Sequence, residues 1–313
     1  TKNLNSELMD LSPTYLDPKN LSDLKDLRLR TNQIVDGLVN GMHRSPFQGH
    51  SVEFAQHREY VAGDDTRYVD WKVFARTDKL HLKQFENETN FCCWLLIDQS
   101  ESMSYRGPQE PLSKFEFASC FAVTMAWLVL NQRDAIAMAT FAESVASLIR
   151  PSDQKANLFQ IVEQLSRTEL IGKTSLSSSL QEVAVEAQHR GIVLVLTDCF
   201  DDFESIAGGI ETLKKRGHQV KLLQVLDRSE LQFDFSMPLK MRGLESGAEF
   251  SVDPVMLRKA YLDVVKKSRD QLVHYCQSHD VDFFQFRSDM NIATAIRWVI
   301  RGRLATERQY ELG

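Results

Sequence analysis

Short apolar runs alternate with helical patterns along the chain from residue 91 to residue 304. Apolar runs of four to eight residues predict buried strands, and apolar residues spaced three and four apart predict helices packed on a sheet. The predicted strands are 91–98, 134–141, 144–149, 191–197, 218–226 and 281–286, and the predicted helices are 113–131, 153–167, 174–190, 203–216, 254–278 and 291–304. This alternation predicts an α/β fold, a doubly wound, mostly parallel sheet with helices on both faces.

The first predicted strand ends in a regular series of oxygen-bearing side chains. It lies in FCCWLLIDQSES, from Phe91 to Ser102, where Asp98, Ser100 and Ser102 follow the apolar run at alternate positions. Open α/β sheets bind ligands at the carboxyl ends of their strands. One carboxylate and two hydroxyls are too few ligands for a divalent cation, so the pattern requires further oxygens from later loops.

Two later residues meet that requirement. Asp198 follows the predicted strand that ends at Thr197, and Thr174 lies in the turn Gly172-Lys173-Thr174-Ser175 before a predicted helix. Parallel strands place their carboxyl ends along one edge, so both side chains are expected beside Asp98. A site made only of oxygens suits Mg²⁺ or Mn²⁺ better than zinc or copper.

Each part of this pattern also has a simpler structural interpretation. Asp98 with Ser100 is typical of a capping turn, Thr174 of a helix N-cap, and Asp198 of a residue that caps the following helix. The run from Gly172 to Ser175 invites comparison with a P-loop, but Arg167 stands where that loop needs its first glycine. The residues alone leave capping and metal binding open.

The combined pattern resembles the metal-ion-dependent adhesion site of von Willebrand factor A domains. D-x-S-x-S after a strand, a later G-x-T and a later aspartate at a strand end occur here in that family's order. Met103 also fits the family, whereas Cys199 stands where many members have glycine. The resemblance implies a von Willebrand A-like fold and a bound Mg²⁺ or Mn²⁺. The residues that it implies as ligands are Asp98, Ser100, Ser102, Thr174 and Asp198.

The segment before this domain is dense in charged and aromatic residues and carries a second resemblance. Its motifs are Glu53-Phe54, Arg58-Glu59-Tyr60, Gly63-Asp64-Asp65, Arg67, Asp70-Trp71-Lys72, Ala75-Arg76 and Phe85-Glu86. Together with His43 to Phe47, Thr197 to Asp202 and Gly217 to Val220, they are similar to the signature of the bacterial family called domain of unknown function fifty-eight. That likeness covers nearly the whole chain.

Two parts of the chain are therefore expected. Residues 1–88 form a smaller α+β segment with a helix over Leu21–Asn40 and a strand over Leu80–Phe85, packed on the main domain. Residues 89–313 form the von Willebrand A-like domain, with an excursion of short strands or loop over 228–252. Arg58, Arg67 and Arg76 among acidic residues predict an ion-pair network that clamps the first part to the second.

Composition narrows the remaining possibilities. The chain has 37 basic and 43 acidic residues and a net charge of −6, so nothing global indicates a nucleic-acid partner. Its five cysteines are odd in number and lack C-x-x-C spacing, which predicts reduced, buried thiols in a cytoplasmic protein. The first ten residues show no secretory signal, and the apolar run from Phe115 to Leu130 is shorter than the ~20 residues of a membrane span.

Two functions follow from the site. The first is a non-enzymatic binding module in which a Glu or Asp of a partner completes the coordination of the ion. The family resemblance implies that this partner is a MoxR-type AAA+ ATPase or its client, in bacterial complex assembly or stress responses.

The alternative is a Mg²⁺-dependent phosphohydrolase with Asp98 as the nucleophile. Ser100 stands where the D-x-D pattern of such enzymes places its general acid, and no lysine motif for a phosphoryl group is evident. The sequence therefore favours binding over catalysis.

Overall fold

The computed structural model describes residues 53–59, 71–77, 80–86, 92–108, 110–235, 239–242, 249–252 and 254–301. The chain divides into two compact units, one formed by Phe47–Phe91 and the other by Thr1–Pro46 together with Cys92–Gly313. Each unit has β-structure of its own. The expected division into residues 1–88 and 89–313 stays a prediction, because residues 1–52 and 87–91 lie outside the described part.

The larger unit is built on a six-stranded sheet with the order β10-β7-β6-β3-β4-β5. Its strands are β3 (Cys92–Asp98), β4 (Ala135–Phe141), β5 (Val145–Ser152), β6 (Gly191–Thr197), β7 (Gln219–Leu226) and β10 (Asp282–Arg287). All neighbours pair in parallel except β4 and β5. A short turn joins β4 to β5, and only an antiparallel pair can be joined without a crossover. The predicted mostly parallel sheet is confirmed.

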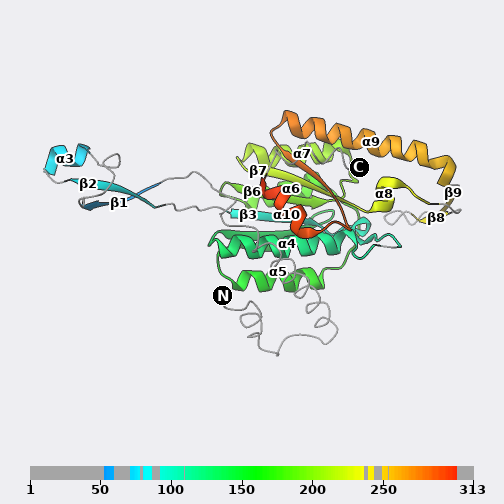
Figure 1. Cartoon of the computed structure of the whole chain (residues 1–313), viewed down its shortest axis with the longest axis horizontal. Coiled ribbons are helices and arrows are strands. Elements are labelled where there is room, and N and C mark those ends of the chain that lie inside the picture. The colour runs from blue at the N-terminus through cyan, green and yellow to red at the C-terminus, as the bar shows by residue number, and fades with distance from the viewer. Residues whose placement is uncertain are drawn as a thin grey trace, which may run out of the picture. The chain divides into compact units, whose positions relative to one another are not determined.

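Helices cover both faces of this sheet. They are α4 (Lys114–Asn131), α5 (Ala156–Arg167), α6 (Leu176–Glu186), α7 (Phe203–Lys215), α9 (Pro254–Ser278) and α10 (Ile292–Arg301). Figure 1 shows α4 and α5 on one side of the sheet and α7 and α9 on the other. The doubly wound arrangement predicted from the alternating pattern is therefore the one observed.

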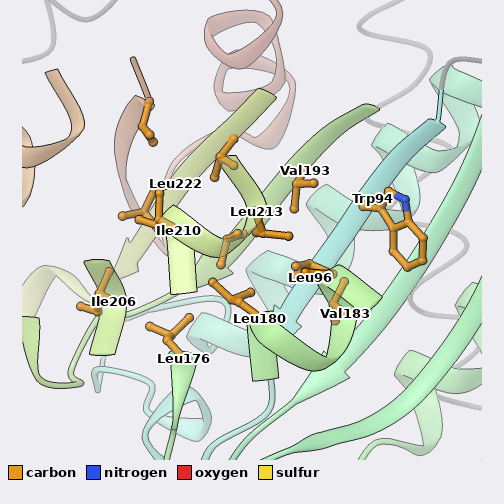
Figure 2. Packing of buried hydrophobic residues seen from close by; sticks show 14 of the residues in the cluster. Trp94, Leu96, Leu176, Leu180, Val183, Val193, Ile206, Ile210, Leu213 and Leu222 are labelled. Atoms are coloured by element: carbon orange, nitrogen blue, oxygen red, sulfur yellow. The ribbon is translucent and has the colours of Figure 1, made fainter. Parts of the chain in front are cut away.

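Strand β3 lies between β4 and β6, and all seven of its residues are buried. Successive side chains of a strand point to opposite faces. Trp94 and Leu96 therefore join the core cluster that includes Leu180 of α6 and Ile210 of α7, as Figure 2 shows. The strand is apolar throughout because both of its faces are covered, and its carboxyl end comes out at the middle of the sheet edge.

Helix α4 is buried along almost its whole length, which explains why its sequence is apolar on every side. It begins with a capping box, in which the Ser113 hydroxyl accepts from the Glu116 amide and the Glu116 carboxylate accepts from the Ser113 amide. None of the described helices has an apolar stretch long enough to cross a membrane. All five cysteines are free and buried, as predicted.

Helix α9 has the predicted bounds but packs less of its length than expected. The helical spacing of Leu257, Tyr261, Val264, Val265, Leu272 and Cys276 in the sequence predicts a stripe that faces the core. Leu272 and Cys276 are buried, whereas Val264 is 67% exposed. That prediction is wrong for a geometric reason. Val264 and Val265 are adjacent and therefore about 100° apart around the helix, so only one of them can face the sheet.

The excursion after β7 forms regular structure of its own. Helix α8 (Arg228–Gln232) follows β7 directly, and a hairpin of β8 (Leu239–Arg242) and β9 (Glu249–Val252) comes next. Phe233 ends α8 in a left-handed conformation, and its buried ring packs against Tyr261 of α9 with ring centroids 4.5 Å apart. This contact fixes the end of α8 on the main domain.

The smaller unit contains an antiparallel pair of β1 (Glu53–Glu59) and β2 (His81–Glu86), with helix α3 (Trp71–Thr77) between them in sequence. Strand β2 confirms the strand predicted over Leu80–Phe85. The predicted helix over Leu21–Asn40 lies outside the described residues, and so does Arg67 of the predicted arginine network, which stays a prediction.

Candidate metal centre

The turn after β3 places three polar side chains at the carboxyl edge of the sheet. Asp98 is fully buried, and its Oδ1 accepts the Ser100 amide at 2.9 Å. The chain then enters a single turn of 3₁₀ helix, η3 (Glu101–Ser104), in which the hydroxyls of Ser100 and Ser102 are 3.0 Å apart. Asp98, Ser100 and Ser102, which alternate in the motif, are therefore brought together at the carboxyl edge of the sheet.

A second loop brings Thr174 to the same carboxylate. The loop is attached by backbone bonds, because the Ile171 amide donates to the Gln99 carbonyl and the Glu101 amide donates to the Gly172 carbonyl. The Thr174 hydroxyl then lies 3.1 Å from Oδ1 and 3.0 Å from Oδ2 of Asp98. Gly172 has a φ of +76°, a conformation that suits glycine.

The end of β6 supplies the next two side chains. The Thr197 hydroxyl donates to Asp98 Oδ2 at 2.7 Å, and Asp198 follows, 1% exposed. Asp198 Oδ1 accepts the Phe200 amide at 3.1 Å. Between them Cys199 has a φ of +59°. This left-handed conformation explains why glycine is common at that position in the family that the site resembles.

The electrostatics of Asp98 are unusual for a carboxylate at pH 7. Burial, together with the charge of Asp198, raises the pKa of Asp98 to about 6, although bonds from Thr197 and Ser100 oppose the change. Among the described residues, no lysine, arginine or histidine forms an ion pair with Asp98. The folded chain thus holds a buried carboxylate whose charge only hydroxyls and an amide stabilise.

The five residues predicted as ligands all lie at this edge. Asp98, Ser100, Ser102 and Thr174 form one chain of contacts, whereas Asp198 acts on Asp98 through its charge and makes its hydrogen bonds elsewhere. Thr197, one residue before Asp198, is in direct contact with Asp98 and was not predicted.

The capping interpretation accounts for only part of this geometry. Asp98 does form a local turn with Ser100, but the N-cap of α6 is Ser175, so Thr174 does not cap that helix. The carboxylate of Asp201 instead accepts the Leu176 amide at 2.9 Å. Thr174 is therefore free of a structural role in α6 and turns its hydroxyl to Asp98.

The donor set fits a hard divalent cation. All candidate ligands are carboxylate or hydroxyl oxygens, which Mg²⁺ and Mn²⁺ prefer. Among the described residues, no group of three or more His, Cys, Asp and Glu side chains is arranged to hold a metal ion, so the hydroxyls must contribute. A buried carboxylate without a cationic partner is the feature that an ion would complete.

A lysine stands beside these ligands that the sequence analysis did not find. Lys114, the first residue of α4, is completely buried, and its Nζ donates to Asp198 Oδ2 and to Glu230 Oε1, each at 2.8 Å. The ammonium also lies 4.7 Å from the centroid of the Phe200 ring. Burial opposes its charge, but Asp198 and Glu230 outweigh burial and raise the pKa of Lys114.

Helix α8 completes the network around this lysine. The second oxygen of Glu230 accepts the Asp227 amide at 2.7 Å, and the buried Asp227 carboxylate accepts the Gly107 amide, also at 2.7 Å. A side chain at Gly107 would place its Cβ 2.6 Å from Asp227 Oδ1, so glycine is required at this close approach. The loops after β3, β6 and β7 are thus joined by buried polar contacts.

No local sequence motif indicates that a lysine reaches this edge of the sheet. Lys114 is separated from Asp198 by 84 residues and from Glu230 by 116, so no local motif shows the contact. One signal was present, because a cation at the first position of a helix opposes the helix dipole. A buried apolar helix that starts with lysine requires a carboxylate nearby.

Comparisons with known proteins were made for the whole chain. The protein Rv1480 of Mycobacterium tuberculosis, described as uncharacterized, is 23% identical over 300 residues, which cover 92% of each chain. An aerotolerance-related membrane protein of Bacteroides fragilis matches 67% of this chain and 98% of its own, with 14% identity and a TM-score of 0.44. The SpRpn10 VWA domain matches 67% of this chain and 96% of its own, with 9% identity and a TM-score of 0.41.

The family assignment comes from a model that matches most of the chain. The model described as "Protein of unknown function DUF58" matches residues 56–271, which include the whole D-x-S-x-S, G-x-T and Asp198 pattern and the family motifs from Arg58 onward. The observed sheet has the mostly parallel, helix-covered architecture expected of a von Willebrand A-like domain. The chain belongs to the DUF58 family and has a von Willebrand A-like fold.

Proposed function

We propose that this protein is a non-enzymatic binding module that recognises a partner protein through a divalent cation, Mg²⁺ or Mn²⁺. The supporting observation is the buried carboxylate of Asp98, which is surrounded by the hydroxyls of Thr174 and Thr197 and lacks a cationic partner among the described residues. The ligands in this proposal are Asp98, Ser100, Ser102, Thr174 and Asp198.

The chemistry of such a site favours an acidic partner. A bound ion would supply a positive centre, and its three hydroxyl ligands add no negative charge to that of Asp98 and Asp198. A glutamate or aspartate side chain of the partner is the natural anionic ligand to complete the coordination. In this proposal the five ligands hold the ion at the edge of the sheet, and the surrounding loops keep Asp98 out of water.

The surroundings of the edge support a protein partner. Phe200 is 49% exposed and Ile171 is 60% exposed, and both belong to loops that position the candidate ligands. A pocket of about 520 Å³ lies beside the same turn, with Tyr105, Phe115 and Leu170 in its lining. Exposed apolar side chains next to polar anchors are common in protein interfaces.

The partner that we propose is a MoxR-type AAA+ ATPase, or a client that it remodels, in bacterial complex assembly or stress response. The support for this choice is the resemblance to the family, and the cytoplasmic setting rests on the five free, buried cysteines.

Lys114 does not support the phosphohydrolase alternative. Both carboxylates around this lysine already accept from its ammonium, and the side chain is completely buried, so it cannot meet a phosphoryl group. Asp98, the required nucleophile, is also fully buried and accepts three hydrogen-bond donors.

Capture of the partner tests this function. We expect the purified MoxR-type ATPase of the same organism to be retained by the wild-type protein in Mg²⁺ and released by chelator. Ser100→Ala should weaken retention by about tenfold or more, because a ligand is lost, while unfolding stability changes by less than about 1 kcal/mol.

Ser147→Ala is the matched control for this experiment. It removes a hydroxyl that pairs with Thr140 at 2.7 Å, on β5, away from the candidate ligands. Retention by this variant should equal that of the wild type. Capture that ignores both chelator and Ser100→Ala would mean that the ion has no part in partner binding.

A further inference from the structure

Lys114 forms the most unusual charge cluster in the described part of the chain. Its side chain and that of Asp198 are 0% and 1% exposed, and Glu230 is 15% exposed. Removing a lysine from water is costly unless its partners are close and its donors are used. Both partners of Lys114 are close, at 2.8 Å, although a positive charge at the first position of a helix opposes the helix dipole.

This cluster shares a carboxylate with the candidate metal centre. Asp198 is a proposed ligand of the ion, and Oδ2 of the same side chain accepts from the Lys114 ammonium at 2.8 Å. Its other oxygen accepts the Phe200 amide at 3.1 Å. A second cation thus competes for the carboxylate that the divalent ion would use.

The arrangement of carboxylates and cations at this edge sets its net charge. Three carboxylates are proposed ligands of the ion or direct partners of the ammonium, Asp98, Asp198 and Glu230, and when ionised their charges are balanced by a divalent ion and one ammonium together. Without the ammonium, the loaded edge would keep a net negative charge and repel a carboxylate brought by a partner.

We propose that Lys114 is a specificity-determining residue of the metal centre, a built-in cation that weakens the hold on the divalent ion and enables the loaded edge to accept an anionic ligand. This inference rests on the proposed function and adds the residue that sets the charge of the ligand. Glu230 of α8 has the opposite effect on the binding of the ion, because its negative charge lies beside the ammonium and offsets it.

The test compares Mn²⁺ affinity, measured from the signal of free Mn²⁺ by electron paramagnetic resonance, with and without acetate at constant ionic strength. Acetate is the probe for a partner carboxylate. If acetate binds beside the ion, it must tighten Mn²⁺ binding, because coupling between two ligands is reciprocal.

Lys114→Met should bind Mn²⁺ about tenfold more tightly than the wild type, because a like charge near the ion is lost. The tightening by acetate should become smaller in this variant. Glu230→Gln should show both changes with opposite sign, and it retains a side chain that can accept from Lys114. If Lys114→Met fails to fold, the direction of the two changes in Glu230→Gln, in Mn²⁺ affinity and in the acetate response, tests the inference alone.

Lys221→Met is the matched control, since Lys221 also forms a buried pair, with Asp282 Oδ2 at 2.7 Å. Lys221 lies near the start of β7, at the opposite edge of the sheet, so its loss should leave both measurements unchanged. Equal Mn²⁺ affinity and equal acetate response in the wild type, Lys114→Met and Glu230→Gln would overturn the inference and leave the proposed function standing. No Mn²⁺ binding by the wild type would overturn both.

Discussion

Lys114→Met should lower the free energy of unfolding by about 3–5 kcal/mol, the usual effect of removing one partner from a buried ion pair. The substitution leaves Asp198 and Glu230 buried without their shared cation. Removing a positive charge from a helix N-terminus works in the other direction, but by only about 0.3–1 kcal/mol, so the loss prevails. Urea denaturation in chelator measures the difference.

A second variant shows whether unpaired charge is the cause. Adding Glu230→Gln to Lys114→Met should recover at least about 1 kcal/mol, because one of the two stranded carboxylates becomes neutral. Glu230→Gln alone should destabilise the protein, since it weakens the bond to the ammonium. If the two substitutions are simply additive, the buried contacts between Lys114 and Glu230 do not contribute as we describe.

Asp98→Asn should stabilise the protein at pH 7 in the absence of divalent ions. The pKa of Asp98 is raised to about 6, mainly by burial, so the folded state binds its proton more tightly than the unfolded chain does. Stability from this group is therefore present at low pH and is lost as the pH rises through about 6. One pKa unit corresponds to ~1.4 kcal/mol, so removing the ionised carboxylate gains at most ~3 kcal/mol.

The expected gain is about 2 kcal/mol, because the new amide must face a hydroxyl that now donates to Asp98. The gain should shrink as the pH falls from about 6 to about 4, because in that range the folded wild type binds the proton of Asp98 and the unfolded chain mostly does not. Asp202→Asn, at an exposed carboxylate that caps no amide through its side chain, is the control and should show no such trend. A gain that stays constant with pH would contradict the described environment of Asp98.

Binding sites often contain residues that lower the stability of the fold but are needed for function. A residue that destabilises the fold is retained where its charge is needed for a ligand. Asp98→Asn should thus improve the fold and abolish the site, whereas an ordinary core substitution harms both.

The sequence was sufficient for those parts of the fold that are defined by local pattern. Strand β3 and helix α9 were predicted within one residue, because an uninterrupted apolar run and a long helical period have few alternatives. Four of the five expected ligands meet in direct contacts, because Asp98, Ser100 and Ser102 lie in one turn after β3 and Thr174 reaches Asp98 from the loop before α6. Asp198 lies at the same edge because β6 is the parallel neighbour of β3.

Other features depend on contacts that no local pattern carries. Lys114 and Glu230 meet across 116 residues, and Glu230 lies in helix α8, in an excursion for which the sequence predicted short strands or loop. Val264 was placed in the core by its apolar character, although the sheet reaches only one side of α9. Long-range pairing of charges is decided by the packed fold, and this is the level at which the sequence analysis failed.

Calorimetric titration of Mn²⁺ into the wild type and Asp98→Asn is the most direct measurement of the central claim, that the carboxyl edge of this sheet binds one divalent cation. The account predicts about one ion per wild-type chain and at least a hundredfold weaker binding by Asp98→Asn, ~2.7 kcal/mol, with the fold of the variant intact. Equal binding of Mn²⁺ by both proteins, or none by the wild type, would contradict it.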